Sequence, residues 1–335
     1  MASPEPIFQI LSAPRIALAL RTAVELDLFT PLDKGPLNAK RIARKRKVTE
    51  RGTRILLDSL QGLKLITKKK STGEYRLAPI AKAHLVKGKP GFIGPILELQ
   101  ADPNMQKAMM SLPAAVRKGG TAVSSNAHSK VQSFWETFAT STNLDATANA
   151  RELAKASGVT ATSGPMKVLD LACGSGRYGI TVAEINPKAE VTLFDQKNVL
   201  KKTRAIARKS KAAKRIHFRE GNLFTKDLGG PYDLVIASHI LHHFSLEDCD
   251  LILKRIHNAM NPGAMVAIQE FIVDNTRSNR TSQILFSLVM LVWTNEGEAY
   301  SFQEYRQLLA ENSFRRIRFT NRQQPSQFVT AVRSK

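Results

Sequence analysis

The chain has 335 residues, of which 43% are hydrophobic and 23% charged, so it has enough apolar material for two domains and is not largely disordered. Two cysteines, Cys173 and Cys249, cannot form a disulfide framework and are typical of a reducing compartment. We find no apolar run of about 18 residues, the length that a membrane span needs, and no secretory signal pattern. We therefore expect a cytoplasmic protein without a membrane partner.

The net charge of +22 raises nucleic acid as a partner. The excess of basic residues is spread over both halves of the chain, with local clusters at 41–47, 68–70 and 201–219. Diffuse basicity of this kind is more typical of a solvated surface than of a surface that reads bases. Specific binding of nucleic acid is therefore not expected, although a winged-helix nucleic-acid binder, including an RNA methyltransferase, stays open as an alternative.

The first third of the chain predicts helices followed by a short hairpin. Residues 7–28 form the first predicted helix, with apolar residues at helical spacing: Ile10, Leu11, Leu18, Ala19 and Leu26. A basic helix over 39–47 follows, and Thr49 is placed to cap a third helix over 51–63. The predicted buried stripe of this third helix is Ile55, Leu56, Leu60 and Leu63. Short strands at 64–67 and 75–77 flank a turn, which completes the pattern of a winged helix.

Beyond residue 165 strands and helices alternate, which predicts a mostly parallel α/β sheet of the Rossmann-like class. The predicted strands, seven with the C-terminal hairpin, are 167–172, 191–195, 216–220, 233–238, 264–271, 314–320 and 327–332. The third strand from the end follows an Asn-Pro-Gly turn at 261–263 and carries Glu270 near its own end.

A glycine-rich loop joins the first of these strands to a helix. Gly174, Ser175 and Gly176 let the backbone approach a ligand, and the helix that follows offers free N–H groups. Asp195 ends the next strand, where a carboxylate can accept both hydroxyls of a ribose. The spacing G-x-G-x-x-G over 174–179 also fits NAD, but Asp170 would repel a pyrophosphate and suits a cationic ligand.

These features together resemble the class I S-adenosylmethionine (SAM) methyltransferases. With the winged helix upstream, the chain is similar over nearly its whole length to the small-molecule O-methyltransferases of the caffeate and acetylserotonin type. The resemblance implies a winged-helix homodimerisation domain over 1–118, a linker and helices over the active site at 119–164, and a SAM-binding domain over 165–335. It implies a SAM site made of Asp170, Gly174, Ser175, Gly176, Asp195, Gly221, Asn222, Leu223 and Ser238.

A histidine-rich stretch follows the fourth strand, and Ser245 with Asp248 then starts a helix in a capping-box pattern. The resemblance identifies His242 as the general base and Glu270 as the residue that orients it. An oxygen nucleophile such as a phenol, with a pKa of about 10, is mostly protonated at neutral pH, and a neutral imidazole can remove that proton. His239, His242 and His243 could instead hold a metal, but no Cys or carboxylate cluster completes such a site, so no metal is expected.

The predicted acceptor pocket is lined by Trp135, Phe138, His243 and Met290. Core packing explains the two aromatic residues equally well, and the apolar helix over 281–293 that carries Met290 suits a pocket, a dimer face or the core. Ala299 stands where plant members use a second glutamate, and Asn222 replaces an acidic residue near the adenosine. We therefore expect a SAM-dependent O-methyltransferase of secondary metabolism, acting on a small hydroxylated, aromatic or polyketide-like molecule. Decarboxylation, hydroxylation or cyclisation with SAM bound stays open as an alternative.

Overall fold

The computed structural model describes residues 3–122, 143–320 and 326–334. The chain divides into two compact units, Met1–Gln100 and Ala101–Lys335, each of which is described by itself. The sequence placed 1–118 in the first domain, whereas the division at Gln100 puts the two helices between 103 and 118 in the second unit.

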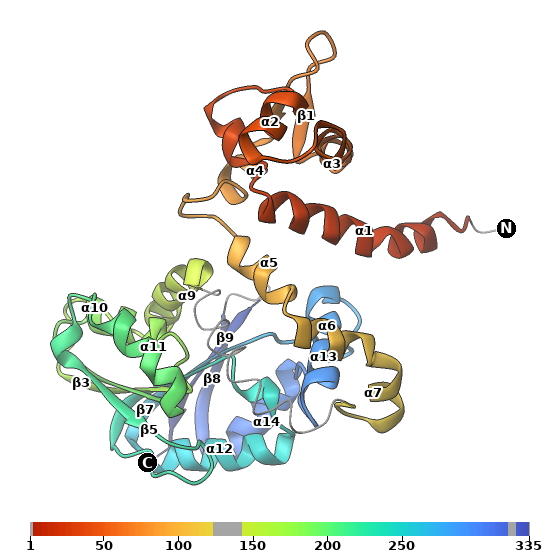
Figure 1. The fold of residues 1–335 in the computed structure, drawn as a ribbon. Coiled ribbons are helices and arrows are strands. Elements are labelled where there is room, and N and C mark those ends of the chain that lie inside the picture. The colour runs from red at the N-terminus through yellow and green to blue at the C-terminus, as the bar shows by residue number, and fades with distance from the viewer. Residues whose placement is uncertain (1–2, 123–142, 321–325, 335) are drawn as a thin grey trace. The chain divides into compact units, whose positions relative to one another are not determined.

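The first unit has the predicted order of helices and wing (Figure 1). Its helices are α1 (Glu5–Glu25), α2 (Ala39–Arg46), α3 (Glu50–Gly62), α4 (Pro79–His84) and α5 (Gly94–Gln100), with a 3-10 turn at Thr30–Lys34. Strands β1 (Ile66–Lys68) and β2 (Tyr75–Leu77) pair antiparallel. The side chain of Asn38 caps α2 and that of Thr49 caps α3, each by accepting a backbone N–H of the first turn.

The burial of α3 differs from the prediction by one position. Ile55, predicted to be buried, is 43% exposed, while Leu57 is wholly buried. Leu60 is buried as predicted, and Leu56 and Leu63 are partly buried. Helical periodicity predicted an apolar face centred too close to Ile55. Ile55 and Leu57 both fit an apolar helical stripe, and only the packing of the folded unit shows that Leu57 is the buried one.

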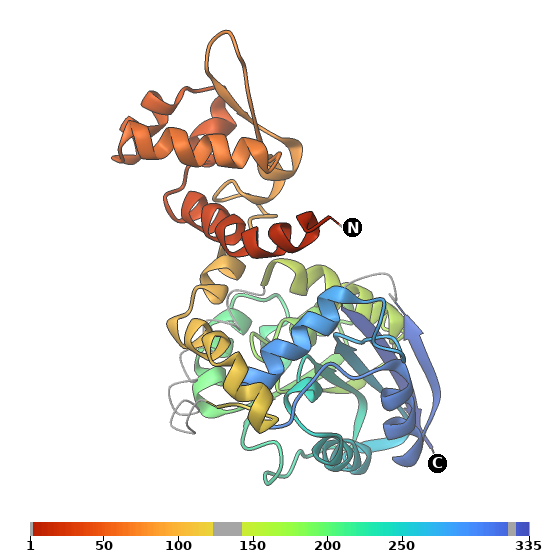
Figure 2. The same ribbon diagram turned by 90° about the vertical axis from the view of Figure 1, so that its right-hand side faces the viewer.

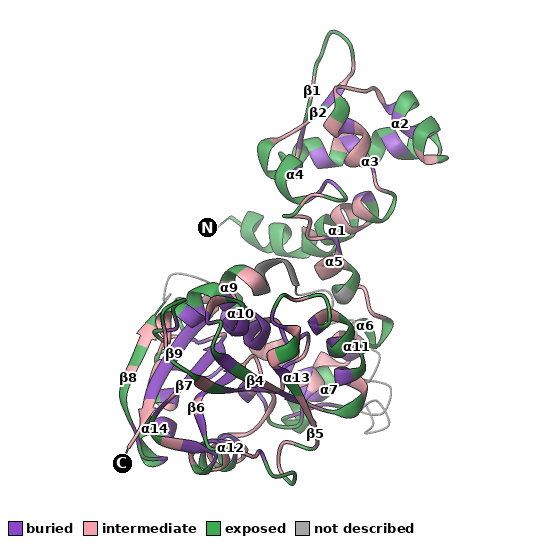
Figure 3. Cartoon of the chain, turned by 90° about the vertical axis from the view of Figure 1, so that its left-hand side faces the viewer, coloured by how far each residue is buried: buried purple, intermediate pink, exposed green. Residues whose placement is uncertain are grey.

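Helix α1 leaves most of its apolar side chains exposed, as Figure 3 shows by its green colour. It has 21 residues, and by length and composition alone it could cross a membrane, which the search for an uninterrupted apolar run did not reveal. Arg15 and Arg21 interrupt the run but leave its average apolar. The absence of a membrane partner and the cytoplasmic location stay predictions.

The second unit contains a seven-stranded sheet in the order β5-β4-β3-β6-β7-β9-β8. Its strands are β3 (Met166–Leu171), β4 (Ala189–Asp195), β5 (Ile216–Glu220), β6 (Tyr232–Ser238), β7 (Met260–Glu270), β8 (Phe314–Thr320) and β9 (Gln327–Arg333). The first five are parallel, and β9 joins β7 antiparallel, so the predicted mostly parallel sheet and its C-terminal hairpin are confirmed. The predicted turn at 261–263 lies inside β7, where the register against β6 shifts.

Helices cover both faces of this sheet (Figures 1 and 3). One face carries α9 (Asn143–Ala156), α10 (Arg177–Ile185) and α11 (Lys197–Ala207), and the other carries α12 (Leu246–Asn258) and α14 (Phe302–Glu311). Successive residues of a strand point alternately into the cores on the two faces: Leu234 and Ile236 pack on the first face, Val235 and Ala237 on the second. This alternation accounts for the nearly continuous apolar sequence of the central strands.

Three further helices pack together in the second unit. Helices α6 (Pro103–Met110) and α7 (Leu112–Lys118) lie beside α13 (Thr281–Trp293), as Figure 2 shows for the gold and blue helices. Ala108 and Ala115 are buried against Val292 of α13. Small residues at these contacts let the helices approach closely.

The strand order places the loops after β3 and β6 next to each other. The chain passes from β3 outward through β4 to β5 and then returns to β6 on the other side of β3. Such a reversal opens a crevice at the carboxyl ends of the strands, where open α/β sheets bind ligands. Both the glycine loop and the histidine-rich stretch begin there.

Candidate active site

The backbone of the loop after β3 has a conformation that lets a ligand approach it closely. Ala172, Gly174 and Gly176 all have positive φ angles. A Cβ on Gly176 would lie 2.8 Å from side-chain carbons of both Leu193 and Thr203, so only glycine fits there. The hydroxyl of Thr203 donates to the carbonyl oxygen of Gly174 and fixes the loop from α11.

Two carboxylates flank this loop. Oδ2 of Asp170 accepts the N–H of Gly179 at 2.7 Å, while Oδ1 is buried and has no partner among the described residues. Asp195 accepts the N–H of Gly174 at 2.9 Å and that of Gln196 at 2.7 Å. Burial raises the pKa of Asp170 to about 8 and that of Asp195 to about 6. A ligand that brings positive charge and hydroxyl donors would satisfy both groups, which fits SAM.

The loop after β5 lies beside Asp195. The N–H of Gly221 donates to the carbonyl of Asp195 at 3.1 Å, and the Asn222 side-chain oxygen accepts the N–H of Phe224 at 2.7 Å. The carbonyl of Leu223 accepts from the guanidinium of Arg255 on α12 at 2.9 Å. Asn222 therefore binds its own turn through its oxygen, and its amide nitrogen can donate to a ligand.

Ser175 and Ser238 complete the predicted cofactor residues. Ser175 is buried within the glycine loop, and Ser238 is the last residue of β6, paired in register with Gln269 of β7. Both lie at the carboxyl edge of the sheet, as the sequence predicted. Their contact with a cofactor stays a prediction.

His242 and Glu270 form a buried pair. Nδ1 of His242 lies 2.5 Å from Oε2 of Glu270, and the other carboxylate oxygen accepts the N–H groups of Ile240 and Leu241, each at 2.9 Å. Burial lowers the pKa of His242 to about 3 and raises that of Glu270. The imidazole is therefore neutral at pH 7, with its proton on Nδ1 toward the carboxylate and a lone pair on Nε2. This is the protonation state that a general base needs.

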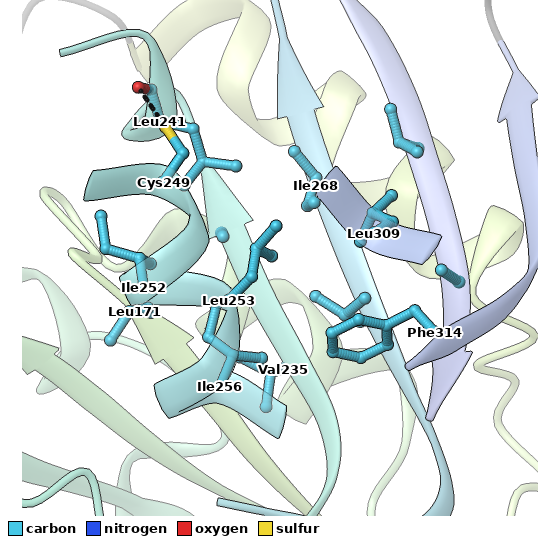
Figure 4. Packing of buried hydrophobic residues seen from close by; sticks show 14 of the residues in the cluster. Leu171, Val235, Leu241, Cys249, Ile252, Leu253, Ile256, Ile268, Leu309 and Phe314 are labelled. Carbon is cyan, nitrogen blue, oxygen red and sulfur yellow. Dashed lines mark hydrogen bonds between the residues drawn. The ribbon is translucent and has the colours of Figure 1, made fainter. Parts of the chain in front are cut away.

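The loop that carries His242 is held from several sides. The Cys249 thiol donates to the carbonyl of Leu241 at 3.2 Å (Figure 4), and the Tyr300 hydroxyl donates to that of Phe244 at 2.5 Å. A Cβ on Gly297 would lie 2.3 Å from the carbonyl oxygen of His242, so the 297 backbone supports the base at a distance that only glycine allows. None of these three contacts was predicted from the sequence.

Aromatic rings surround the base. The ring of Phe286 meets that of His242 edge to face with centroids 4.9 Å apart, and Phe271 lies 4.5 Å from Phe286. The ring of His243 lies 4.3 Å from that of His242, and its predicted place in the acceptor pocket stays a prediction. Phe286 was missed, although it stands one helical turn before Met290 on α13, which is a signal that the sequence offered.

The other predicted pocket residues are Met290, Trp135 and Phe138, and the segment around Ala299 is where a second glutamate was sought. Met290 is buried on α13, on the same side as Phe286. Trp135 and Phe138 lie outside the described residues. Glu298 binds Arg277 at 3.4 Å at the surface, and Ala299 is wholly buried, so neither residue supplies a second carboxylate to His242.

The sequence indicated no Cys or carboxylate cluster that would complete a metal site with the histidines, but Glu270 lies beside two of them. Ring nitrogens of His239 and His242 and an oxygen of Glu270 lie within 4.8 Å of one another, because the end of β7 is adjacent to the end of β6. Two ligands of a tetrahedral zinc ion would be roughly 3.3 Å apart, given bonds of about 2.0 Å. The 2.5 Å contact between His242 and Glu270 is instead a hydrogen bond, and we assign no metal role to it.

Comparison with known proteins decides the family. An O-methyltransferase domain model matches residues 109–315, and an O-methyltransferase dimerisation domain model matches residues 8–87. The chain belongs to the O-methyltransferase family. As a member, it is a SAM-dependent methyltransferase, which confirms the predicted fold, enzyme class and cofactor. The predicted boundaries at 118 and 164 stay predictions.

Relatives of this O-methyltransferase align over nearly its whole length. The tetracenomycin polyketide synthesis 8-O-methyltransferase TcmO of Streptomyces glaucescens is 28% identical, with 95% of this chain and 93% of the relative covered. Acetylserotonin O-methyltransferase of Mus musculus is 29% identical over 92% of this chain and 83% of its own. A solved candidate O-methyltransferase of Nostoc punctiforme superposes with a TM-score of 0.91, at 31% identity over 99% of this chain and 100% of its own.

Proposed function

We propose that this O-methyltransferase transfers a methyl group from SAM to an aromatic hydroxyl of a small, polyketide-like molecule, with His242 as the general base. The observation that carries the proposal is the neutral His242 ring, held by Glu270 and facing Phe271 and Phe286. Aromatic walls suit a flat acceptor. Relatives that act on aromatic molecules support this class: TcmO in tetracenomycin synthesis and a 3-hydroxy-5-methyl-1-naphthoate 3-O-methyltransferase of Streptomyces sahachiroi.

The chain's own residues divide the work between cofactor and acceptor. Asp195 would accept the ribose hydroxyls, Asp170 would face the positively charged part of the cofactor, and the loop at 174–176 would lie against it. Bound SAM supplies an electrophilic methyl group on a sulfonium. Nε2 of His242 takes the acceptor's hydroxyl proton as the oxygen attacks, and Glu270 stabilises the imidazolium that forms. The buried ring cluster keeps water from the reacting oxygen.

We also propose that the protein is a homodimer through α1. The O-methyltransferase dimerisation model covers α1 from residue 8 onward, and this helix exposes Ile7, Phe8, Ile10, Leu11, Ile16 and Leu18. A contiguous apolar surface of this kind is typical of an obligate subunit interface.

The test of the catalytic proposal is transfer of labelled methyl from SAM to a panel of naphthols and hydroxyanthraquinones, followed by mass spectrometry. We expect a product heavier by one methylene group and a His242→Ala enzyme slower by roughly 10²–10⁴-fold with unchanged SAM affinity. Equal turnover by the variant would contradict the role of His242. An acceptor consumed without gain of a methyl group would instead favour decarboxylation, hydroxylation or cyclisation.

A further inference from the structure

Tyr300 is a buried phenol in the segment between α13 and α14, and only 2% of its surface is exposed. Its hydroxyl donates to the carbonyl of Phe244 at 2.5 Å. This bond ends two residues after His242, on the turn that carries the base. The mechanism above gives the bond no part.

The turn at 240–244, called the base turn from here on, is held at both of its ends. Glu270 accepts two backbone N–H groups at its start. At its other end Phe244 has an extended backbone, and its carbonyl accepts from Tyr300 before α12 begins. His242 lies between these two supports, so the direction of its ring depends on both of them.

The backbone of Tyr300 is anchored beyond the same strand that carries Glu270. Val273, which lies three residues after the end of β7, donates its N–H to the carbonyl of Tyr300 at 3.1 Å. Val273 also forms a parallel bridge with Ser301. Both supports of the base turn therefore depend on the end of β7 and the residues that follow it.

The segment around Tyr300 is also tied to the helix that carries the aromatic wall. The N–H of Ala299 donates to Oγ of Ser287 on α13 at 3.2 Å. Ser287 directly follows Phe286, whose ring meets that of His242 edge to face. A displacement of this segment would therefore change the position of the base relative to the wall.

The Tyr300 hydroxyl is a donor under all assay conditions. Burial raises the pKa of this phenol above its usual value of about 10, so the hydroxyl keeps its proton. The other group near the carbonyl of Phe244 is the Cys249 thiol, at 4.0 Å. Removal of the phenol oxygen would thus leave a buried carbonyl without its strong donor and would loosen the base turn.

We infer that Tyr300 is a positioning residue for the base: its hydroxyl holds the end of the base turn, so that Nε2 of His242 meets the acceptor's hydroxyl beside the aromatic wall. The inference rests on the proposed role of His242 and extends it to a residue that acts only through the turn. A misplacement of about 1 Å can cost roughly 10²-fold in rate. Since a neutral hydroxyl needs the base and an ionised one does not, the effect of Tyr300 depends on the ionisation of the acceptor.

A matched pair of acceptors tests the inference: 1-naphthol, which is neutral at about pH 8, and 4-nitro-1-naphthol, whose nitro group makes its hydroxyl ionise at that pH. With 1-naphthol, Tyr300→Phe should lower the single-turnover rate of methyl transfer by roughly 10- to 100-fold, with KM and SAM affinity within about twofold of wild type. With the nitro compound the loss should stay below about threefold. His242→Ala should show the same contrast, with a larger loss for 1-naphthol.

Tyr305→Phe is the matched control. The ring of Tyr305 lies 6.1 Å from that of Tyr300, and its buried hydroxyl has no hydrogen-bond partner among the described residues. Its loss should leave both rates unchanged. If Tyr300→Phe fails to fold, Ser287→Ala loosens the same segment and should show a smaller loss with the same dependence on the acceptor; a loss without that dependence would count against the inference.

Equal losses with the two naphthols in Tyr300→Phe, or an unchanged rate with 1-naphthol, would overturn the inference and leave the role of His242 standing. A loss in Tyr305→Phe as large as that in Tyr300→Phe would overturn it too, because ring packing would then be the cause. Equal losses for both acceptors in His242→Ala would instead contradict the proposed base. No methyl transfer to either naphthol or to the wider panel would overturn the proposed function itself.

Discussion

Glu270 binds His242 with one carboxylate oxygen, at 2.5 Å, and the N–H groups of Ile240 and Leu241 with the other. One side chain thus sets both the backbone of the catalytic loop and the orientation of its ring. The carboxylate accepts all three of these hydrogen bonds, so neither of its oxygens carries a proton. A substitution at Glu270 should therefore affect catalysis strongly, although Glu270 acts on the acceptor only through His242.

Glu270→Gln should inactivate the enzyme nearly as fully as loss of His242. The amide oxygen would stay with the two backbone N–H groups, so the amide nitrogen would face Nδ1 of His242 and donate to it. The ring would then carry its proton on Nε2 and could not accept one from the acceptor. We expect kcat to fall by roughly 10²–10⁴-fold at unchanged SAM affinity. Steady-state kinetics and calorimetry measure both, Glu298→Gln at the surface serves as the matched control, and near-normal turnover would refute the tautomer argument.

The pH profile should lack the acid limb of an ordinary histidine. The base must be neutral, and burial lowers the pKa of His242 to about 3, so it loses basic function only as pH falls far below the usual value of about 6.5. At saturating SAM, we expect kcat/KM for the acceptor to stay level between about pH 6 and 8 when the acceptor does not titrate there. A limb centred near 6.5 that disappears in His242→Ala would contradict this.

The same depressed pKa has a consequence for stability. The unfolded chain binds a proton at His242 below about pH 6.5, whereas the folded chain does not until much lower pH. Its contribution to stability is therefore complete above that pH and is lost as pH falls through the window between the two pKa values. The burial of His239 and His243 lowers their pKa values in the same direction. The raised pKa values of Asp170 and Asp195 act in the opposite direction, so the comparison between variants is what tests the linkage. Relative to His242→Gln, the thermal unfolding midpoint of the wild type should decline as pH falls from 7 to 5.

Cofactor binding should release a proton from Asp170. Burial raises the pKa of this carboxyl to about 8, so it is largely protonated at pH 7, and a positively charged ligand favours its ionised form. SAM affinity should therefore rise with pH from about 6.5 to 8.5, with release of about one proton at neutral pH. Calorimetry in buffers of different ionisation enthalpy measures this number. Asp170→Asn should lose the release, and an unchanged release would assign the proton to the cofactor's own amino group.

Gly297→Ala should disturb the base without touching it through a side chain. The added Cβ would lie 2.3 Å from the carbonyl oxygen of His242, so the backbone of one segment must move. Overpacking of this kind costs about 1–3 kcal/mol of stability, and a displaced base can lower kcat by roughly 10²-fold. Gly164→Ala, where a Cβ meets nothing within 4 Å, is the control. Full activity of the Gly297 variant would show that the loop adapts.

The exposed side of α1 should hold two subunits together. Leu11→Glu places a charge among side chains that are more than half exposed in one chain, and we expect the variant to sediment as a monomer or to aggregate. Ile80→Glu, at a similarly exposed isoleucine of the same unit, should leave the sedimentation coefficient unchanged. A wild-type protein that sediments as a monomer at micromolar concentration would contradict the interface.

The sequence predicted what local patterns determine. Each of the seven strands of the sheet appears within a few residues of its predicted bounds, because apolar runs between turn residues are a local signal. His242 and Glu270 were paired through the family resemblance, and the parallel pairing of β6 with β7 explains why they meet. The supports of the base were missed. Tyr300 and Gly297 act through contacts between segments far apart in the chain, and Cys249 acts through a turn of the chain that returns its thiol to Leu241. The prediction of a turn at 261–263 was wrong, because pairing of β7 with β6 overrides the local turn signal of Asn-Pro-Gly.

The position of β9 makes the orientation of the base depend on the C-terminal hairpin. Glu270 is paired in register with Gln327, and the side chain of Gln327 accepts the N–H of Ile272 at 2.8 Å. One residue of β9 thus holds both the end of β7 that carries the carboxylate and the backbone that follows it. Loosening of the hairpin would therefore displace Glu270, and with it the ring of His242, while the glycine loop and its two aspartates lie on the other side of β6.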